Sequence, residues 1–256
     1  MSDHDPVMHD RQRLFGLSFA SFARIDDVMH MIEGVDLSAT DRFRYVVTPN
    51  ADHIVRLKQA PTLRKIYNGA WLCLNDSRVI QLLLRLGGTN LPAIRGSDLA
   101  LELLTSQWIE DKRVIVIGGD ERVSQRLNSL CKAEMVFHYN PPLGFIRSKE
   151  AIGKVVDFIE SHLPAVVFLA VGSPNQEIVA DACVRRGLRH GIAFCIGAAI
   201  LMAAGVERRA PPAVQFAGLE WLYRLARDPR RLASRYLRDV KILPIVAREI
   251  IRRRSL

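Results

Sequence analysis

Between residues 43 and 196, short apolar segments rich in β-branched residues alternate with longer segments of helical periodicity. Alternating strands and helices form parallel strand pairs, so this pattern predicts an α/β fold with a mostly parallel sheet and helices on both faces. The expected strands are Phe43–Val47, Trp71–Leu74, Arg113–Ile117, Met135–Tyr139, Val166–Val171 and Ile192–Ile196. The expected helices are Ala51–Tyr67, Ser77–Leu86, Asp98–Ile109, Glu121–Cys131, Lys149–Ser161 and Asn175–Arg186.

Polar and glycine-containing segments follow four of these expected strands. They are Thr48-Pro49-Asn50, Asn75-Asp76-Ser77, Gly118-Gly119-Asp120 and Gly172-Ser173-Pro174. Ligands of open parallel sheets bind beyond the carboxyl ends of the strands. We therefore expect a binding site at this edge of the sheet.

Two of these segments could hold a phosphate group. In the segment that begins at Gly172, Ser173 and Gln176 have the spacing of a helix capping box, with Pro174 at the first helical position. The same turn would present backbone N–H groups at a helix N-terminus, which stabilise a phosphate. The Gly118-Gly119 turn repeats the arrangement, although its surroundings lack the GxGxxG dinucleotide fingerprint.

Asp76 directly follows the expected strand Trp71–Leu74. An aspartate at such a position often caps the next helix. At the ligand edge of a sheet, its carboxylate could instead act as a general base, provided that it reaches the proton to be removed.

The C-terminal part of the chain differs from the rest in composition and in pattern. Residues 205–256 contain 13 Lys/Arg and 5 Asp/Glu, which leaves 23 against 22 for residues 1–204. A cationic end on a nearly neutral body predicts an anionic partner that meets one end of the molecule. We expect a flexible N-terminus at residues 1–12, an α/β core at 13–205 and a basic helical appendage at 206–256.

Within this appendage, Asp228-Pro229 predicts a break between two helices, with Asp228 as the N-cap. Arginines spaced by three or four residues would share a face of these helices: Arg224, Arg227, Arg231, Arg235 and Arg238. Val240–Ile251 is amphipathic, is interrupted by Pro244 and ends in three arginines. That pattern fits a helix on an anionic membrane surface, or a packing helix with a solvated charged face.

No run of about 18 apolar residues occurs that could span a bilayer. The polar start, with no apolar leader segment, predicts a cytoplasmic protein. The cysteines are far apart and lie in apolar stretches, so we expect buried, reduced thiols. No His/Asp/Glu cluster has the spacing of metal ligands, and we expect neither a metal nor a cofactor.

Five motifs occur in an order that resembles one family of enzymes. They are Thr48-Pro49-Asn50-Ala51-Asp52, Arg95-Gly96-Ser97-Asp98-Leu99, Gly172-Ser173-Pro174-Asn175-Gln176-Glu177, Arg209-Ala210-Pro211 and Gly218-Leu219-Glu220-Trp221-Leu222-Tyr223-Arg224-Leu225. From about Leu14 to Tyr236 the chain resembles the WecG/TagA/CpsF glycosyltransferases, glycosyltransferase family 26. The resemblance implies a Rossmann-like core and a mobile C-terminal appendage that completes the site.

It also implies the activity: inverting, metal-independent transfer of a sugar from a UDP-sugar to a sugar on a polyprenyl diphosphate, at the cytoplasmic membrane face. By resemblance, Asp76 is the candidate base, and Thr48, Asn50 and Gln176 are polar residues of the pocket. Arg224, Arg231 and Arg235 match the arginines that meet the diphosphate. The other expected substrate contacts are Arg95, Gly118, Gly119, Tyr139, Gly172, Ser173, Pro174, Glu177 and Arg209.

The chain departs from the family at two places. Asn75-Asp76-Ser77 stands where Pro-Asp-Gly is usual, and the glycine-rich segment Ile196–Met202 lacks the usual acid. The candidate donors are therefore UDP-N-acetylmannosamine, UDP-glucose and UDP-glucuronic acid, in the synthesis of an exopolysaccharide or a cell-surface glycan. The expected partners are this donor, the lipid-linked acceptor and the membrane surface, with a homo-oligomer left open and no nucleic acid.

Two other functions fit parts of the sequence. The net charge of +9 and the arginine face fit a module that binds nucleic acid or anionic membranes without catalysis. The α/β pattern also fits a nicotinamide-dependent enzyme, although the glycine fingerprint is missing.

Overall fold

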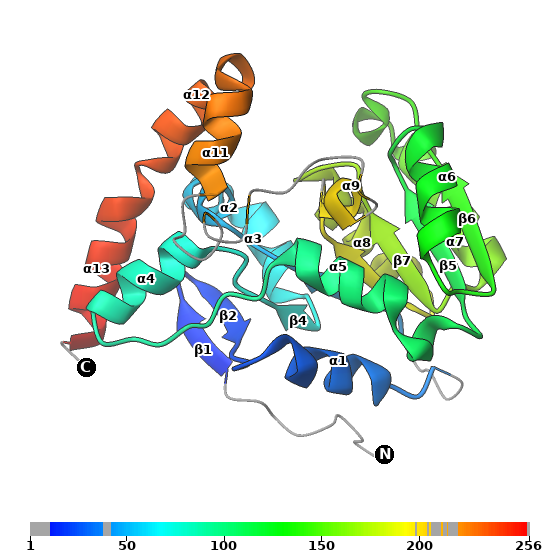
Figure 1. The fold of residues 1–256 in the computed structure, drawn as a ribbon, viewed down its shortest axis with the longest axis horizontal. Coiled ribbons are helices and arrows are strands. Elements are labelled where there is room, and N and C mark those ends of the chain that lie inside the picture. The colour runs from blue at the N-terminus through cyan, green and yellow to red at the C-terminus, as the bar shows by residue number, and fades with distance from the viewer. Residues whose placement is uncertain are drawn as a thin grey trace.

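We describe a computed structural model of the 256-residue chain. The structure describes residues 11–37, 42–197, 199–203, 205, 211, 214 and 220–254. A six-stranded, fully parallel sheet with the order β4-β3-β8-β7-β5-β6 forms its centre (Figure 1). Its strands are β3 (Arg44–Val47), β4 (Leu72–Cys73), β5 (Arg113–Ile117), β6 (Met135–Tyr139), β7 (Val166–Leu169) and β8 (Ile192–Cys195). The predicted parallel sheet is confirmed.

Helices cover both faces of the sheet, as predicted. Successive strand residues point to opposite faces, so Val46 joins one hydrophobic cluster and Val47 the other. One face carries α2 (Ala51–Leu57), α3 (Pro61–Asn68), α4 (Arg78–Leu86), α7 (Lys149–His162) and α8 (Asn175–Arg186). The other carries α1 (Ile25–Glu33), α5 (Gly96–Thr105), α6 (Glu121–Leu130) and α9 (Ala199–Ala203). Two short 3-10 helices are η1 (Gln107–Ile109) and η2 (Phe145–Arg147).

The long helix expected over residues 51–67 is two helices, α2 and α3. The break falls before Pro61, because proline disfavours a helical conformation in the preceding residue and is itself suited to the first helical position. As a result, α2 is a short helix that starts directly at the carboxyl end of β3. Its N-cap is Asn50, one of the expected pocket residues.

The sequence analysis did not predict α1 or an N-terminal hairpin. The hairpin consists of β1 (Arg11–Leu14) and β2 (Leu17–Ala20), joined by a turn in which Phe15 and Gly16 have positive φ angles. Its apolar side chains join the core, and α1 covers the opposite face of the sheet. Arg11 and Gln12, assigned above to a flexible N-terminus, therefore belong to a strand; residues 1–10 lie outside the described part of the chain.

The C-terminal segment is helical, and its helices are α11 (Glu220–Arg227), α12 (Pro229–Asp239) and α13 (Ile242–Arg254). The predicted break at Asp228-Pro229 is confirmed. The predicted interruption at Pro244 is wrong. Pro244 is the third residue of α13, where no intrahelical partner is available for a backbone N–H, so the helix runs through it.

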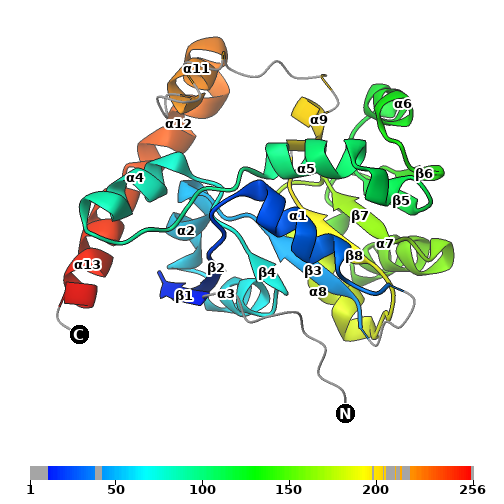
Figure 2. The ribbon, with the colours of Figure 1, turned by 60° about the horizontal axis from the view of Figure 1, so that its bottom comes forward.

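α13 packs against the core through α2 and α4 (Figure 2). Ile242, Ile245 and Val246 are buried in the same cluster as α2, α3 and α8. Gly87, just after α4, has no room for a side chain because a Cβ atom there would lie 2.5 Å from Ile250 Cγ1. Of the two interpretations of this amphipathic segment, the structure favours the packing helix for its apolar face. No helix among the described residues is long and apolar enough to cross a membrane.

Candidate active site

The strand order places the polar segments along one edge of the sheet. Asp76 follows the edge strand β4, Thr48 follows β3, and the Gly172–Glu177 segment follows β7. Neighbouring strands lie about 4.8 Å apart, so β4 is about 14 Å from β7 and about 19 Å from β5. Tyr139, at the end of β6, is farther still. The edge is thus a row of polar groups that an elongated ligand could span.

The Asp76 carboxylate is held by the start of a helix on a different segment. Its Oδ1 accepts a hydrogen bond of 2.9 Å from the backbone N–H of Gly96, the first residue of α5. The next helix along the chain, α4, is capped instead by Ser77, whose hydroxyl accepts from the Ile80 N–H at 3.2 Å. Asp76 is half-buried. It is therefore not the N-cap of α4, and its carboxylate has a fixed position at the carboxyl end of β4.

Asn75 ties this part of the edge together. Its buried side-chain amide donates to the carbonyl groups of Ser77 and Leu91, and its Oδ1 accepts from the Ser77 N–H at 3.0 Å. The Asn75 carbonyl also accepts from the Ile94 N–H at 2.8 Å. These bonds connect the strand that carries Asp76 to the segment that leads into Gly96. Asn75 thus has a structural function next to Asp76.

Thr48 lies beside the same helix start. Its hydroxyl donates to the Cys195 carbonyl at 3.2 Å, which joins the ends of β3 and β8. A Cβ atom on Gly96 would lie 3.2 Å from Thr48 Oγ1, so the missing side chain of Gly96 makes room for this hydroxyl. Thr48 and Asp76 therefore meet at Gly96, as two expected site residues brought together from different loops.

Asn50 is oriented by its own helix. Its Oδ1 accepts from the His53 backbone N–H at 3.4 Å, and its backbone N–H donates to His53 Nδ1 at 3.0 Å. Because the carboxamide oxygen faces a backbone donor, the amide nitrogen is the end that remains for a ligand.

The Gly172–Asn175 turn is confirmed as a strand-to-helix connection, but the predicted capping box is wrong. Pro174 is the N-cap of α8, and no side chain of the described residues caps this helix. Arg56 of α2 instead binds the turn, donating to Ser173 O at 3.3 Å and to Ser173 Oγ at 3.2 Å. Gly172 has a φ of 75°, and a Cβ atom there would have no neighbour within 4 Å in the described part of the chain, so this side of the turn is open to it.

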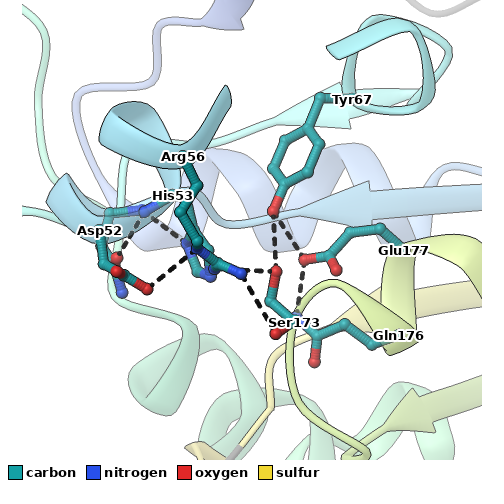
Figure 3. Close-up of polar contacts among 8 residues, drawn as sticks. Asp52, His53, Arg56, Tyr67, Ser173, Gln176 and Glu177 are labelled. Carbon is teal, nitrogen blue, oxygen red and sulfur yellow. Dashed lines mark hydrogen bonds and ion pairs between the residues drawn. The ribbon is translucent and has the colours of Figure 1, made fainter. Parts of the chain in front are cut away.

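Gln176 and Glu177 lie at the start of α8 and face the protein interior (Figure 3). The exposed fraction is 3% for Gln176 and 1% for Glu177. Glu177 Oε1 accepts from the Tyr67 hydroxyl at 2.8 Å and from Gln176 Nε2 at 3.0 Å. Burial, and next the charge of Glu177, raise the pKa of Tyr67, so its hydroxyl stays protonated and donates to the carboxylate. The expectation that Glu177 touches substrate stays a prediction.

The Gly118-Gly119 turn has different features. Both glycines have positive φ angles, and a Cβ on Gly118 would come within 3.0 Å of the Ala170 carbonyl group. Asp120 caps α6 by accepting from the Val123 N–H at 3.1 Å, which places a carboxylate at this helix start. On the neighbouring strand, the Tyr139 ring is stacked on Phe158 with 5.2 Å between ring centroids.

The arginines expected to contact substrate are only partly described. Arg95 Nε donates to Asp98 Oδ2 at 2.7 Å, which holds the side chain at the start of α5. Arg209 lies outside the described residues. Arg224 lies on α11, and Arg231 and Arg235 lie on α12, but their side chains are not among those described. The backbone of α12 lies against α2, the helix that starts at Asn50 (Figure 1).

Arg56, Tyr67 and Gly96 are parts of this site that the sequence patterns do not predict. Gly96 belongs to the motif at residues 95–99, but no neighbouring residue in the sequence indicates that its N–H would bind Asp76, 20 residues earlier. Arg56 binds Ser173, which is 117 residues away in the sequence, and Tyr67 binds Glu177, which is 110 residues away. Among the described residues, no group of three or more His, Cys, Asp or Glu could hold a metal ion.

This is an open parallel α/β fold whose polar residues lie at the carboxyl ends of the strands, where such folds bind their ligands. The model of the glycosyl transferase WecG/TagA/CpsF family matches residues 13–256, so the chain belongs to this family and is a glycosyltransferase. It is similar to the N-acetylglucosaminyldiphosphoundecaprenol N-acetyl-beta-D-mannosaminyltransferase of Bacillus spizizenii, with 27% identity over 192 residues. That match covers 73% of this chain and 72% of the relative.

Proposed function

We propose that the protein transfers a sugar from a UDP-sugar to a saccharide carried by a polyprenyl diphosphate. The observation that carries this proposal is the meeting of Asp76 and Thr48 at Gly96, a fixed carboxylate beside a hydroxyl at the ligand edge. The relative's name supports the lipid-linked acceptor and allows UDP-N-acetylmannosamine as the donor. UDP-glucose and UDP-glucuronic acid are the other candidates.

The row of polar groups suggests how the donor lies. A base within about 3 Å of the attacking hydroxyl is within about 6 Å of the anomeric carbon. The diphosphate is bonded to that carbon, so the nearer turn, at Gly172, suits it better than the Gly118-Gly119 turn. No described side chain caps the start of α8, whereas the Asp120 side chain already accepts from the Val123 N–H at the start of α6. The nucleoside then extends towards β5 and Tyr139.

In the proposed reaction, Asp76 removes the proton of the acceptor hydroxyl while its oxygen attacks the anomeric carbon. The leaving UDP departs from the opposite face, so the configuration inverts. The Gly96 N–H holds the Asp76 carboxylate in position for this proton transfer. Arg224, Arg231 and Arg235 stabilise the charge that develops on the diphosphate, in place of a metal ion. Each such charge stabiliser is typically worth about 3 kcal/mol, or a factor of about a hundred in rate.

The C-terminal helices would also bring the enzyme to its lipid acceptor. Leu237, Val240 and Leu243 are exposed near the junction of α12 and α13 and stand beside Arg238 and Lys241. Apolar side chains next to cationic ones suit the interface of an anionic membrane. This part of the proposal places the protein at the cytoplasmic face of the membrane, as a peripheral protein.

The test is transfer to a lipid-diphosphate-linked N-acetylglucosamine from a panel of UDP-sugars, followed by mass spectrometry, with wild type and Asp76→Asn compared. The Asn oxygen can still accept from the Gly96 N–H, so we expect an unchanged melting temperature and UDP affinity. Loss of a general base costs about 10²- to 10⁴-fold in kcat. Asp111→Asn, an exposed carboxylate before the amino end of β5, is the matched control and should stay active. Full activity of Asp76→Asn would exclude it as the base.

A further inference from the structure

The orientation of the Gln176 amide is determined by its buried neighbour. Gln176 faces Glu177 Oε1, which also accepts a hydrogen bond from the Tyr67 hydroxyl. A carboxylate oxygen accepts hydrogen bonds and donates none, so the amide must turn its NH2 group towards Glu177. The amide oxygen of Gln176 therefore points away from Glu177. It is buried and has no hydrogen-bond partner among the residues that the structure describes.

This unpartnered oxygen lies at the ligand edge of the sheet. A Cβ atom on Gly197, directly beyond β8, would lie 3.3 Å from Gln176 Oε1. Thr48 reaches the same strand end from the other side, through its bond to the Cys195 carbonyl. β3 and β7 flank β8, so these two side chains stand on strands about 10 Å apart.

The polarity of the other groups at this edge is also determined. The Thr48 hydroxyl donates its proton in a hydrogen bond to the Cys195 carbonyl, so the hydroxyl oxygen can only accept a further hydrogen bond. Asn50 turns its oxygen to the His53 N–H, which leaves its amide nitrogen as a donor. Around the end of β8, Thr48 and Gln176 thus offer acceptors and Asn50 offers a donor.

We propose that Glu177 is a positioning residue that makes Gln176 a hydrogen-bond acceptor for the transferred sugar, so that the group facing Gln176 must be a hydroxyl or an amide N–H. This inference rests on the proposed function, because it takes the ligand at the end of β8 to be the sugar of the donor. It replaces direct substrate contact as the role of Glu177. A carboxylate cannot occupy this place, since two acceptors would face each other. A uronic acid donor would have to direct its carboxylate elsewhere.

The strength of the effect follows from the burial of the oxygen. A buried acceptor that is left without its partner costs about 1–3 kcal/mol, a factor of about 5 to 150. A donor analogue that lacks the matching hydroxyl should therefore lose about 100-fold in kcat/KM. In Glu177→Gln, residue 177 can donate as well as accept, so the Gln176 amide has two orientations of similar energy. The penalty for the same analogue should then fall to about 10-fold or less.

The experiment measures kcat/KM for the best UDP-sugar and for its monodeoxy analogues, plus an O-acetyl analogue if the sugar carries an acetamido group. Wild type, Glu177→Gln and Tyr67→Phe are compared, with thermal unfolding to verify that each is folded. Tyr67→Phe removes a hydrogen bond from the same carboxylate but leaves the Gln176–Glu177 bond. We expect one analogue to lose about 100-fold in kcat/KM in wild type and in Tyr67→Phe, but about 10-fold or less in Glu177→Gln.

Two results would overturn the inference: an equal penalty in wild type and Glu177→Gln, or no analogue that wild type discriminates against by more than about 5-fold. A purely structural role of Glu177 would lower kcat/KM for the parent donor and for the analogue by the same factor. A failure of the proposed function looks different. In that case wild type transfers no sugar and UDP does not raise its melting temperature, and the inference falls with it.

Discussion

Ile245→Ala tests whether the last helix of the chain is part of the core. The exposed fraction of Ile245 is 7%, and its side chain joins the cluster formed with α2, α3 and α8. The substitution removes three carbon atoms, worth about 2.4 kcal/mol at about 0.8 kcal/mol each. The cavity left behind adds to this loss, and such substitutions cost about 2–5 kcal/mol in total. Since a domain is stable by about 5–15 kcal/mol, this is a large fraction of its stability.

The assay is urea unfolding followed by circular dichroism, with Ile251→Ala as the matched control. Ile251 lies on the same helix and is 64% exposed, so its truncation should change the free energy of unfolding by less than about 0.5 kcal/mol. The gain in helix propensity is similar at both positions and cancels in the comparison. Equal effects of the two substitutions would refute the packing of α13 on the core. If Ile245→Ala is the more destabilising substitution, as predicted, then truncating the chain after Gly205 would remove part of the core together with the basic helices.

Alkaline pH should destabilise the protein. Burial raises the pKa of Cys183 to about 12, above its ordinary value of 9.0, and also raises the pKa of Tyr67. The unfolded state then loses these protons first, so stability is complete below about pH 9 and falls as pH rises towards 12, by about 1.4 kcal/mol per pH unit for each group. Urea midpoints measured against pH should show this, with a smaller slope above pH 10 for Tyr67→Phe. EDTA should leave initial transfer rates unchanged, because arginines take the place of a metal in the proposed reaction. Activity lost in EDTA and restored by magnesium or manganese would contradict this.

The architecture could be predicted from the sequence because it depends on local patterns. Arg113–Ile117 and Met135–Tyr139 have the expected bounds. The first contains a continuous apolar run, which is typical of a buried parallel strand, whereas the second is a partly exposed edge strand. The hairpin at Arg11–Ala20 was missed because it follows a polar start and has only four residues in each strand. The prediction of a single helix over residues 51–67 was wrong because Pro61 disfavours a helical conformation at Ala60.

The composition of the edge was predictable, but its connections were not. Asp76, Thr48 and Asn50 lie at strand ends, as expected. The predicted capping box would join Ser173 to Gln176, but Ser173 binds residues far away in the sequence and Gln176 binds its sequence neighbour. Arg56 and Tyr67 bind Ser173, and Glu177 binds Gln176. Whether a side chain caps its own helix or binds a residue elsewhere depends on tertiary packing, which cannot be predicted from the spacing of residues in the sequence.

Helix α2 belongs to both halves of the molecule. Its first turn orients Asn50, its Arg56 side chain holds the Ser173 turn, and α12 and α13 lie against it. The C-terminal helices and the proposed donor site therefore both contact α2. Under the proposed function, a chimaera that grafts the C-terminal helices of a relative onto this core should therefore need the relative's α2 as well, because both parts contact the same seven residues.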